Sequence, residues 1–219
     1  MSKPSFIIMY TNNLTFLQLC LIIQPLVKEM YLVGGCVRDM VIGKQPKDFD
    51  LVVDGNLDLI EEELLKSGWQ IDGAGKQFFV LIASRNGQQF EIAMFRKDGT
   101  YTDGRRPDYV EVGTIKEDAE RRDFTINSLY MNPWTGEILD PTYRGLQDIK
   151  DKLIRFNGNV KNRIKEDKLR IMRCYRFSMQ LGFEIDKKTL KACRSYFDLM
   201  TKEVSSTRIM NEIEKMVGL

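Results

Sequence analysis

The segment "YLVGGCVRDMVIGKQPKDFDLVV", residues 31–53, constrains the fold of this 219-residue chain more than any other part. Two apolar runs, at residues 30–33 and 49–53, have the length and composition of short buried strands. Between them lie Gly34-Gly35, which permit a tight backbone turn, and the start of a helix that Gly43 would end. We therefore expect a strand, a tight turn, a short helix and a second buried strand within a sheet.

The rest of the sequence divides into a part with predicted strands and a helical part. Asn86-Gly87 lies between two apolar runs and predicts a β-hairpin. Helices are expected at 14–27 and 57–67, strands at 78–83, 89–95, 127–131 and 137–139, and a polar loop at 97–107. After about Gly145 the strands stop and the spacing is helical, at residues 163–183 and 187–219. We predict an α+β head of residues 1–145, with a mixed sheet and flanking helices, and a helical piece of residues 146–219.

The chain contains no histidine. This excludes Ser-His-Asp and Cys-His catalysis, histidine-ligated zinc and acid–base chemistry by histidine, so catalysis must use carboxylates, cations or a metal held by oxygen. The four cysteines include no C-x-x-C pair, and we expect free, mostly buried thiols in a cytoplasmic protein. The apolar stretch 14–27 is too short to span a bilayer, so no membrane contact is expected.

Asp48 and Asp50 directly precede the apolar residues of the second strand. In a strand, residues i and i+2 point to the same face, so the two carboxylates would project together. Two unpaired carboxylates this close repel each other, and a divalent cation removes the conflict. Mg²⁺ takes a few carboxylates together with substrate phosphates, and a pair of such ions is a common arrangement for attack at phosphorus. An Asp-rich turn is the structural alternative.

Gly34, Gly35 and Arg38 add features of a phosphate site to this carboxylate pair. Backbone N–H groups at glycine can point at phosphate oxygens, and an arginine guanidinium can form bidentate hydrogen bonds with a phosphate. We predict a triphosphate cradle beside a two-metal site held by Asp48 and Asp50. Two readings of Asp39 stay open: it is part of this site, or it is a structural anchor of the turn.

"GGCVRD" followed by "KDFDLVV" resembles the head of class II tRNA nucleotidyltransferases, the CCA-adding enzymes, and their poly(A) polymerase relatives. Four more motifs follow in the family's order: "EIAMFR", "RRDFTINSL", "DPTYRGLQDI" and "EDKLRIMRCYRF", and "SSTRIMNEIEK" resembles the family's neck. The resemblance covers residues from about 30 to the end and implies a polymerase β-like nucleotidyltransferase head followed by a helical neck. Body and tail domains, which usually follow the neck, are expected to be absent: either the sequence is a piece of a longer enzyme, or it is a minimal enzyme to which a partner protein supplies tRNA binding.

The resemblance also implies the chemistry and the remaining site residues. The reaction would be metal-dependent, template-independent addition of CCA, or its terminal A, to the tRNA 3′ end from CTP and ATP, with release of pyrophosphate. Poly(A) addition from ATP and an inactive nucleotide- or RNA-binding module stay open as alternatives. Glu91 is a candidate third metal carboxylate, or else a structural partner of Arg96. Arg122 would contact the nucleotide, and Asp123 or Asn127 would read the ribose hydroxyls.

A helix with Asp167, Arg170, Arg173 and Arg176 at intervals of three could select the nucleotide. Cytosine and adenine each present an amino donor beside a ring-nitrogen acceptor, whereas uracil and guanine present the reverse. A carboxylate acceptor beside an arginine donor therefore fits C and A, and the resemblance implies this use for Asp167 and Arg170. Arg173 and Arg176 would hold phosphates or stack. A salt-bridged surface helix is the alternative.

Residues 161–176 hold seven basic residues against Glu166 and Asp167, a local charge of +5. Such a concentration favours a phosphate-bearing partner, although a solvated helix face has the same composition. We expect nucleoside triphosphates and the tRNA 3′ end as partners.

Overall fold

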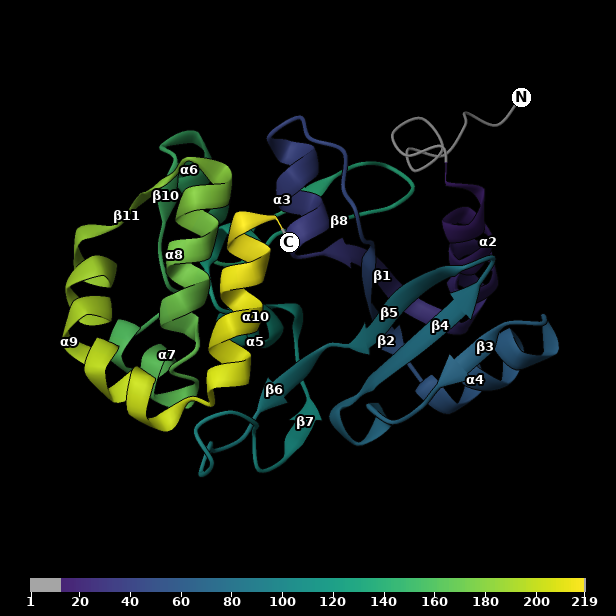
Figure 1. Ribbon diagram of the computed structural model, residues 1–219. Coiled ribbons are helices and arrows are strands. Elements are labelled where there is room, and N and C mark those ends of the chain that lie inside the picture. The colour runs from purple at the N-terminus through teal and green to yellow at the C-terminus, as the bar shows by residue number, and fades with distance from the viewer. Residues whose placement is uncertain (1–12, 219) are drawn as a thin grey trace. The chain divides into compact units, whose positions relative to one another are not determined.

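The computed structural model describes residues 13–218, so residues 1–12 of the predicted head and Leu219 lie outside the described part. The chain forms two compact units (Figure 1). Among the described residues, unit 1 comprises residues 13–97, 110–118 and 129–141, and unit 2 comprises residues 98–109, 119–128 and 142–218. The units thus divide near residue 141, and two short segments of the predicted head belong to unit 2.

Unit 1 contains a seven-stranded mixed sheet in the order β3-β4-β5-β2-β1-β8-β9. Within that sheet β2 and β5 pair in parallel and the other described neighbours are antiparallel. The strands are β1 (Val27–Val33), β2 (Asp50–Gly55), β3 (Gln70–Asp72), β4 (Val80–Arg85), β5 (Gln88–Met94), β8 (Tyr130–Met131) and β9 (Ile138–Leu139). The predicted mixed sheet with flanking helices is confirmed.

Three helices of unit 1 were expected from the sequence, but the first ends at residue 23 and not at the predicted residue 27, and the helix at Ile115–Arg121 was not predicted. The helices of unit 1 are α2 (Leu14–Ile23), α3 (Gly35–Val41), α4 (Leu57–Lys66) and α5 (Ile115–Arg121), whose last residues belong to unit 2, with 3₁₀ turns η1 (Gln24–Leu26) and η2 (Lys76–Phe78). The β4–β5 hairpin turns at Asn86 and Gly87, both with positive φ, as the Asn-Gly pair predicts. The core includes Leu51, Val53 and Ile92, which are fully buried. The core is therefore formed in part by the strands that the apolar runs predicted.

Unit 2 is mainly helical. Its helices are α6 (Gly145–Lys150), α7 (Val160–Glu166), α8 (Arg170–Leu181), α9 (Lys187–Glu203) and α10 (Ser206–Val217), and α8 and α10 pack side by side (Figure 1). Phe124, in the segment that leads into η3 (Thr125–Asn127), stacks on Phe156 with 4.9 Å between ring centroids. Phe177 of α8 meets Phe124 edge-on at 5.5 Å, and all three rings are buried.

Several predicted elements differ from the observed ones. Residues 163–183 are interrupted between α7 and α8, and residues 187–218 form two helices separated at Val204–Ser205. Residues 125–127 are a 3₁₀ turn, so the strand predicted at 127–131 shrinks to β8. Strands do not stop at residue 145, because β10 (Leu153–Ile154) pairs in parallel with β11 (Glu184–Ile185). A further short pair, β6 (Arg96–Asp98) with β7 (Val110–Val112), frames the predicted polar loop.

Between residues 13 and 218, no helix has both the length and the apolar character needed to cross a membrane.

Candidate active site

Gly34 makes the turn from β1 into α3. Its φ of 80° and ψ of −131° lie in a region that residues with a side chain rarely adopt, which explains the glycine. Arg38 lies one helical turn later and is buried, and its guanidinium lies near Gly35: a Cβ on Gly35 would be 3.6 Å from Arg38 Nη2. Gly34, Gly35 and Arg38 are therefore neighbours in unit 1, as expected.

Asp39 is an ion-pair partner of Arg38. Nε and Nη2 of Arg38 donate to Asp39 Oδ1 at 2.9 and 2.7 Å. This contact favours the structural reading of Asp39, because the carboxylate helps to fix the direction of the arginine. Phosphate binding by Gly34, Gly35 and Arg38 stays a prediction.

Aromatic packing fixes which face of the sheet carries the carboxylates. Phe16 of α2 stacks on Phe49 at 4.8 Å and meets Phe90 at 5.3 Å, so these two rings point to the face that α2 covers. Asp50 follows Phe49 and Glu91 follows Phe90, and side chains alternate along a strand. Asp50 and Glu91 therefore point to the opposite face.

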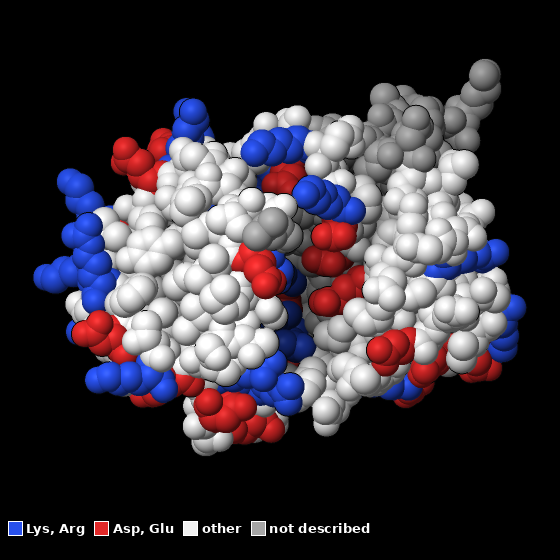
Figure 2. Space-filling view, viewed as in Figure 1, with Lys and Arg blue, Asp and Glu red and all other residues white. Residues whose placement is uncertain are grey.

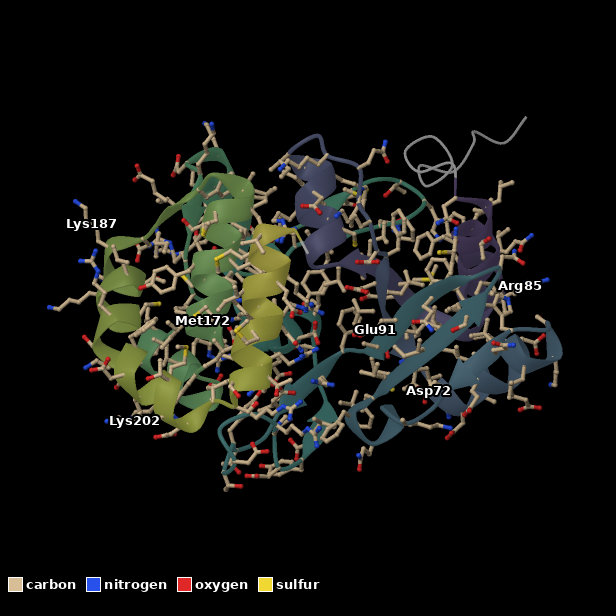
Figure 3. All side chains as sticks on the ribbon, in the orientation of Figure 1. Asp72, Arg85, Glu91, Met172, Lys187 and Lys202 are labelled. Carbon is tan, nitrogen blue, oxygen red and sulfur yellow. The ribbon has the colours of Figure 1, made fainter. Side chains whose placement is uncertain are left out.

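Asp50 and Glu91 are also register partners in the parallel pair of β2 and β5. Residues paired across neighbouring strands are on the same face, so the two carboxylates lie side by side there. Glu91 is labelled on β5 in Figure 3. Asp48 precedes the strand by two residues and is exposed. The sequence pattern of Asp48 and Asp50 thus gains a third carboxylate from a strand that is distant in the chain.

The carboxylates are oxygen donors of the kind that Mg²⁺ prefers. Within residues 13–218, however, no three Asp, Glu or Cys side chains already converge on one point as metal ligands. Cys36 is near Asp50, and burial, with a smaller contribution from the Asp50 charge, raises the pKa of its thiol to about 12. The Cys36 thiol therefore stays protonated at neutral pH and does not add a negative charge beside Asp50.

In unit 2, Asp167 lies at the break between α7 and α8. Its backbone is extended, with φ −151° and ψ 108°, so it does not stand in the first turn of one continuous helix, as the spacing had predicted. Asp167 Oδ1 accepts from the Leu169 N–H at 3.0 Å, and Oδ2 accepts from Arg208 Nη2 of α10 at 2.9 Å. Its short side chain competes with helix for a backbone N–H, which explains the break.

Arg170 begins α8 and has different partners from Asp167. Its Nη1 donates to Glu166 Oε2 at 2.6 Å and to the Arg163 carbonyl at 3.0 Å. Asp167 is thus held by the Leu169 N–H and Arg208, whereas Arg170 is held by Glu166 and the Arg163 carbonyl. Reading of a base by this pair stays a prediction.

Asp123, Asn127 and Arg173 form a connected group in unit 2. Asp123 Oδ1 accepts from Asn127 Nδ2 at 3.1 Å, and Oδ2 accepts from Arg173 Nε at 2.8 Å. Burial alone would raise the pKa of Asp123, but the charge and hydrogen bond of Arg173 and the bond from Asn127 hold that pKa below its ordinary value. The carboxylate raises the pKa of Arg173 in turn. This group therefore stays ionised, and its contact with a ribose stays a prediction.

Arg176 connects α8 to α10. Its Nε donates to Glu212 Oε2 at 2.6 Å, its Nη1 donates to Gln180 Oε1 at 3.0 Å, and its guanidinium lies 4.1 Å from the ring centre of Phe177. Both charged side chains are buried. The predicted contact of Arg176 with a nucleotide is untested, whereas its contact with α10 is direct.

The basic cluster of residues 161–176 is largely neutralised inside unit 2. Five of its seven cations form ion pairs with carboxylates: Arg163 and Arg170 with Glu166, Lys168 with Glu203, Arg173 with Asp123, and Arg176 with Glu212. Most of the charge that favoured a phosphate partner thus supports the helices themselves.

Sequence reasoning missed residues that hold these groups in place. Asn157 is buried, and its Nδ2 lies 3.0 Å from the carbonyls of Ala119 and Arg122 and 2.6 Å from Ser128 Oγ. It therefore supports the backbone around Asp123. No local pattern distinguishes it, because its partners are about 30 to 40 residues away in the chain.

Comparison with known proteins connects these features to one family. The sequence profile described as "Poly A polymerase head domain" matches residues 30–155, and that described as "Probable RNA and SrmB-binding site of polymerase A" matches residues 182–218. A CCA-adding enzyme of Enterococcus faecalis is 40% identical over 190 residues, which are 86% of this chain and 45% of that protein.

Solved structures agree with this assignment. The fold is similar to a Bacillus stearothermophilus CCA-adding enzyme in complex with CTP, with a TM-score of 0.80 and 27% identity over 99% of this chain and 49% of that one. A tRNA nucleotidyltransferase with a primer tRNA and an ATP analogue has a TM-score of 0.72 and 31% identity, over 90% of this chain and 55% of that one. The chain spans about half the length of these relatives. The resemblance inferred from the motifs is confirmed: the chain belongs to the family of class II CCA-adding enzymes and poly(A) polymerases and has its polymerase β-like head.

Proposed function

We propose that the chain is a metal-dependent nucleotidyltransferase that adds CCA, or its terminal A, to the 3′ end of tRNA. The observation that carries this proposal is the register of Asp50 with Glu91, on the face of the sheet opposite Phe49. The 3′-hydroxyl of the primer attacks the α-phosphate of CTP or ATP, and pyrophosphate leaves. The names of the relatives support the choice of tRNA as substrate.

The metal assignment rests on the donor set of unit 1. Asp48 and Asp50 would hold Mg²⁺, with Glu91 as a candidate third ligand, because Asp50 and Glu91 are register partners on one face of the sheet and Asp48 precedes Asp50 by two residues. Bound Mg²⁺ supplies positive charge that stabilises the phosphoryl oxygens and makes the attacking hydroxyl more acidic. Backbone N–H groups at Gly34 and Gly35, with Arg38, bind the triphosphate.

Residues of unit 2 select the nucleotide in this proposal. Asp167 accepts the amino proton of cytosine or adenine, and Arg170 donates to the adjacent ring nitrogen. Arg122 contacts the nucleotide, and Asp123 with Asn127 reads the ribose. Arg173 and Arg176 support this surface through Asp123 and Glu212 and supply positive charge for the phosphates.

Substitution of the paired carboxylates tests the metal assignment. Asp48→Asn and Asp50→Asn should each abolish nucleotide addition, while the fold and weak nucleotide binding persist, since the amide keeps the size but loses the charge. The assay uses Mg²⁺, each labelled nucleoside triphosphate, and tRNAs that end at the discriminator base, at C or at CC. Asp54→Asn, at the other end of β2, is the matched control and should keep wild-type activity. Substantial activity of Asp50→Asn would contradict the two-metal assignment.

Poly(A) addition is the second candidate, favoured by the description of the profile that matches residues 30–155. The same assay separates the two, because a poly(A) polymerase would incorporate ATP and not CTP. An inactive binding module would bind nucleotides and incorporate none.

A further inference from the structure

Strands β3, β4 and β5 carry a row of three uncharged polar side chains on one face, which we call the polar strip: Gln70, Ser84 and Gln89. Ser84 is the register partner of both Gln70 and Gln89, so the three residues form one line across the strands. The neighbouring register partners Ala83 and Phe90 are buried, and Phe90 contacts α2. Because side chains alternate along a strand, the strip points away from α2, and both of its glutamines are exposed.

The polar strip lies directly beside the carboxylate pair of the candidate active site. Gln89 precedes Glu91 by two residues on β5, so both side chains are on the same face, about 7 Å apart along the strand. Glu91 is in turn the register partner of Asp50 on β2. The strip and these carboxylates therefore form one continuous surface within unit 1.

A cavity of about 530 Å³ is lined by all three strip residues together with the turn of the β4–β5 hairpin. Among its described lining residues Arg85 is the charged one, and it already has partners: Nη1 donates to the Ser67 carbonyl at 3.1 Å, and the guanidinium lies 5.5 Å from the ring centre of Trp69. Figure 2 shows a mostly white, uncharged surface over β4 and β5, and Figure 3 labels Arg85 near the hairpin. The cavity thus offers hydrogen-bonding groups and little positive charge.

The chemistry of the strip suits a neutral, hydrogen-bonding ligand. A side-chain amide offers two donors and an acceptor, and a hydroxyl offers both functions. The next row on this face holds Asp72 and Glu91, both paired with Ile82, and their negative charge disfavours phosphate groups there. The base edges and ribose hydroxyls of an unpaired nucleotide are neutral and carry matching donors and acceptors.

The position of the strip matches the direction from which a primer must arrive. In the sheet, β2 with Asp50 lies between β1 and β5. The predicted triphosphate cradle at Gly34 and Gly35 follows β1 on one side of Asp50, and the strip runs from β5 to β3 on the other side. In phosphoryl transfer the attacking and leaving oxygens lie roughly in line across the phosphorus. A triphosphate held beside β1 therefore requires the attacking 3′-hydroxyl to approach from the side of β5.

We propose that the polar strip binds the unpaired 3′-terminal nucleotides of the RNA primer through hydrogen bonds to base edges and ribose hydroxyls. The inference rests on the proposed function and deepens it, because it places the primer end on unit 1, on the side of the carboxylates away from β1. It makes Gln70 and Gln89 positioning residues for the primer and gives them no part in binding the incoming nucleotide.

Removal of the two amides at constant side-chain length tests the proposal. The strip variant combines Gln70→Met with Gln89→Met, which removes the hydrogen-bonding groups. The control variant combines Gln18→Met with Gln24→Met, two exposed glutamines of unit 1 outside the cavity. Circular dichroism checks that both variants fold. The first assay measures kcat and KM with Mg²⁺, for a tRNA ending in CC and for ATP.

The strip variant should raise the KM for the tRNA by about tenfold and leave kcat and the KM for ATP nearly unchanged, because two neutral partners of the primer are lost. The control variant should match wild type. An unchanged KM for the tRNA, or a rise in the KM for ATP alone, would overturn the proposal.

A binding assay separates this proposal from the proposed function, since it needs no nucleotide transfer. Fluorescence anisotropy compares a tRNA ending in CC with the same tRNA trimmed to its last base pair, without nucleotides or Mg²⁺. Wild type should prefer the CC end, and the strip variant should lose most of that preference. The loss should be the same at 50 and 200 mM KCl, because neutral contacts release no counterions.

Equal affinity of wild type for the two tRNAs, or a preference that the strip variant retains, would also overturn the proposal. A loss that shrinks at high salt would indicate a phosphate contact and contradict it. If wild type shows the preference but adds no nucleotide, the proposed function fails and the strip assignment stands.

Discussion

At the residue scale, Asp123 shows how a buried charge can be favourable. It is almost fully enclosed, and its two oxygens accept from Arg173, Asn127 and the Phe124 N–H. The penalty of burial is outweighed by these contacts, and the pKa of Asp123 lies below its ordinary value as a result. A carboxylate held in this way stabilises the folded state only while it is ionised.

Asp123→Asn should therefore change the pH dependence of stability. The lowered pKa means that the contribution of Asp123 is present above the ordinary Asp value of about 3.9 and is lost as pH falls below it. At pH 7 the variant should lose about 1.5–3 kcal/mol of unfolding free energy, because a charged hydrogen-bond partner of Arg173 is removed. Urea unfolding at pH 7, 4 and 3 should show the gap to wild type shrinking with acidity. Asp198→Asn, on exposed helix surface, is the control, and a gap independent of pH would refute the argument.

At the scale of elements, the break between α7 and α8 places Asp167 where it can serve two purposes. Its carboxylate binds the Leu169 N–H and Arg208, which are structural contacts, and its position before α8 is where the base-reading role was predicted. Substitution alone cannot separate these roles, because removing the carboxylate removes both. A variant that loses Arg208 but keeps Asp167 provides the comparison.

Asp167→Ala should relax base choice if the carboxylate reads the nucleotide. Discrimination against UTP and GTP, measured as relative kcat/KM for the four nucleotides, should fall by one to two decades, for a loss of about 1–3 kcal/mol. Arg208→Ala should lower rates for all four nucleotides and keep the preference for C and A, since the acceptor remains. If both variants lose rate and keep the preference, Asp167 has a structural role only.

The elements also show what the sequence could and could not predict. Apolar runs of five or more residues and the Asn-Gly turn predicted β2, β4, β5 and their hairpin. The two- and three-residue strands β3, β10 and β11 were missed because they are too short for a period to appear, whereas the equally short β9 was predicted at residues 137–139. Contacts such as that of Arg176 with Glu212 join residues 36 apart, which local spacing cannot reveal. The sequence pattern revealed the carboxylate group only in part. Asp48 and Asp50 are close in sequence, whereas Glu91 becomes a neighbour of Asp50 only because β2 pairs with β5.

At the scale of the molecule, each of the two compact units has its own core and its own group of predicted site residues. Asp50 and Glu91 project from the face of the sheet opposite α2, and neither is part of the apolar core. The metal should thus matter for chemistry and contribute little to folding.

Removal of divalent cations should separate the two effects. EDTA should abolish nucleotide addition, and added Mg²⁺ should restore it, because the proposed reaction needs the ion. The unfolding temperature measured without nucleotide should change by no more than about 1–2 °C, since a ligand at or below its dissociation constant stabilises by well under 1 kcal/mol. A large fall in unfolding temperature on chelation would contradict this and indicate a structural ion.

The parallel pairing of β2 with β5 has a consequence for the order of folding. The β4–β5 hairpin closes locally around Asn86-Gly87, whereas pairing of Asp50 with Glu91 must close a loop of about 40 residues through α4, β3 and β4. Long closures of this kind are slow compared with local turns. We expect the hairpin to form first and to dock on β2 later. The carboxylates would then become neighbours late in folding, after the scaffold that must tolerate their mutual repulsion has already formed.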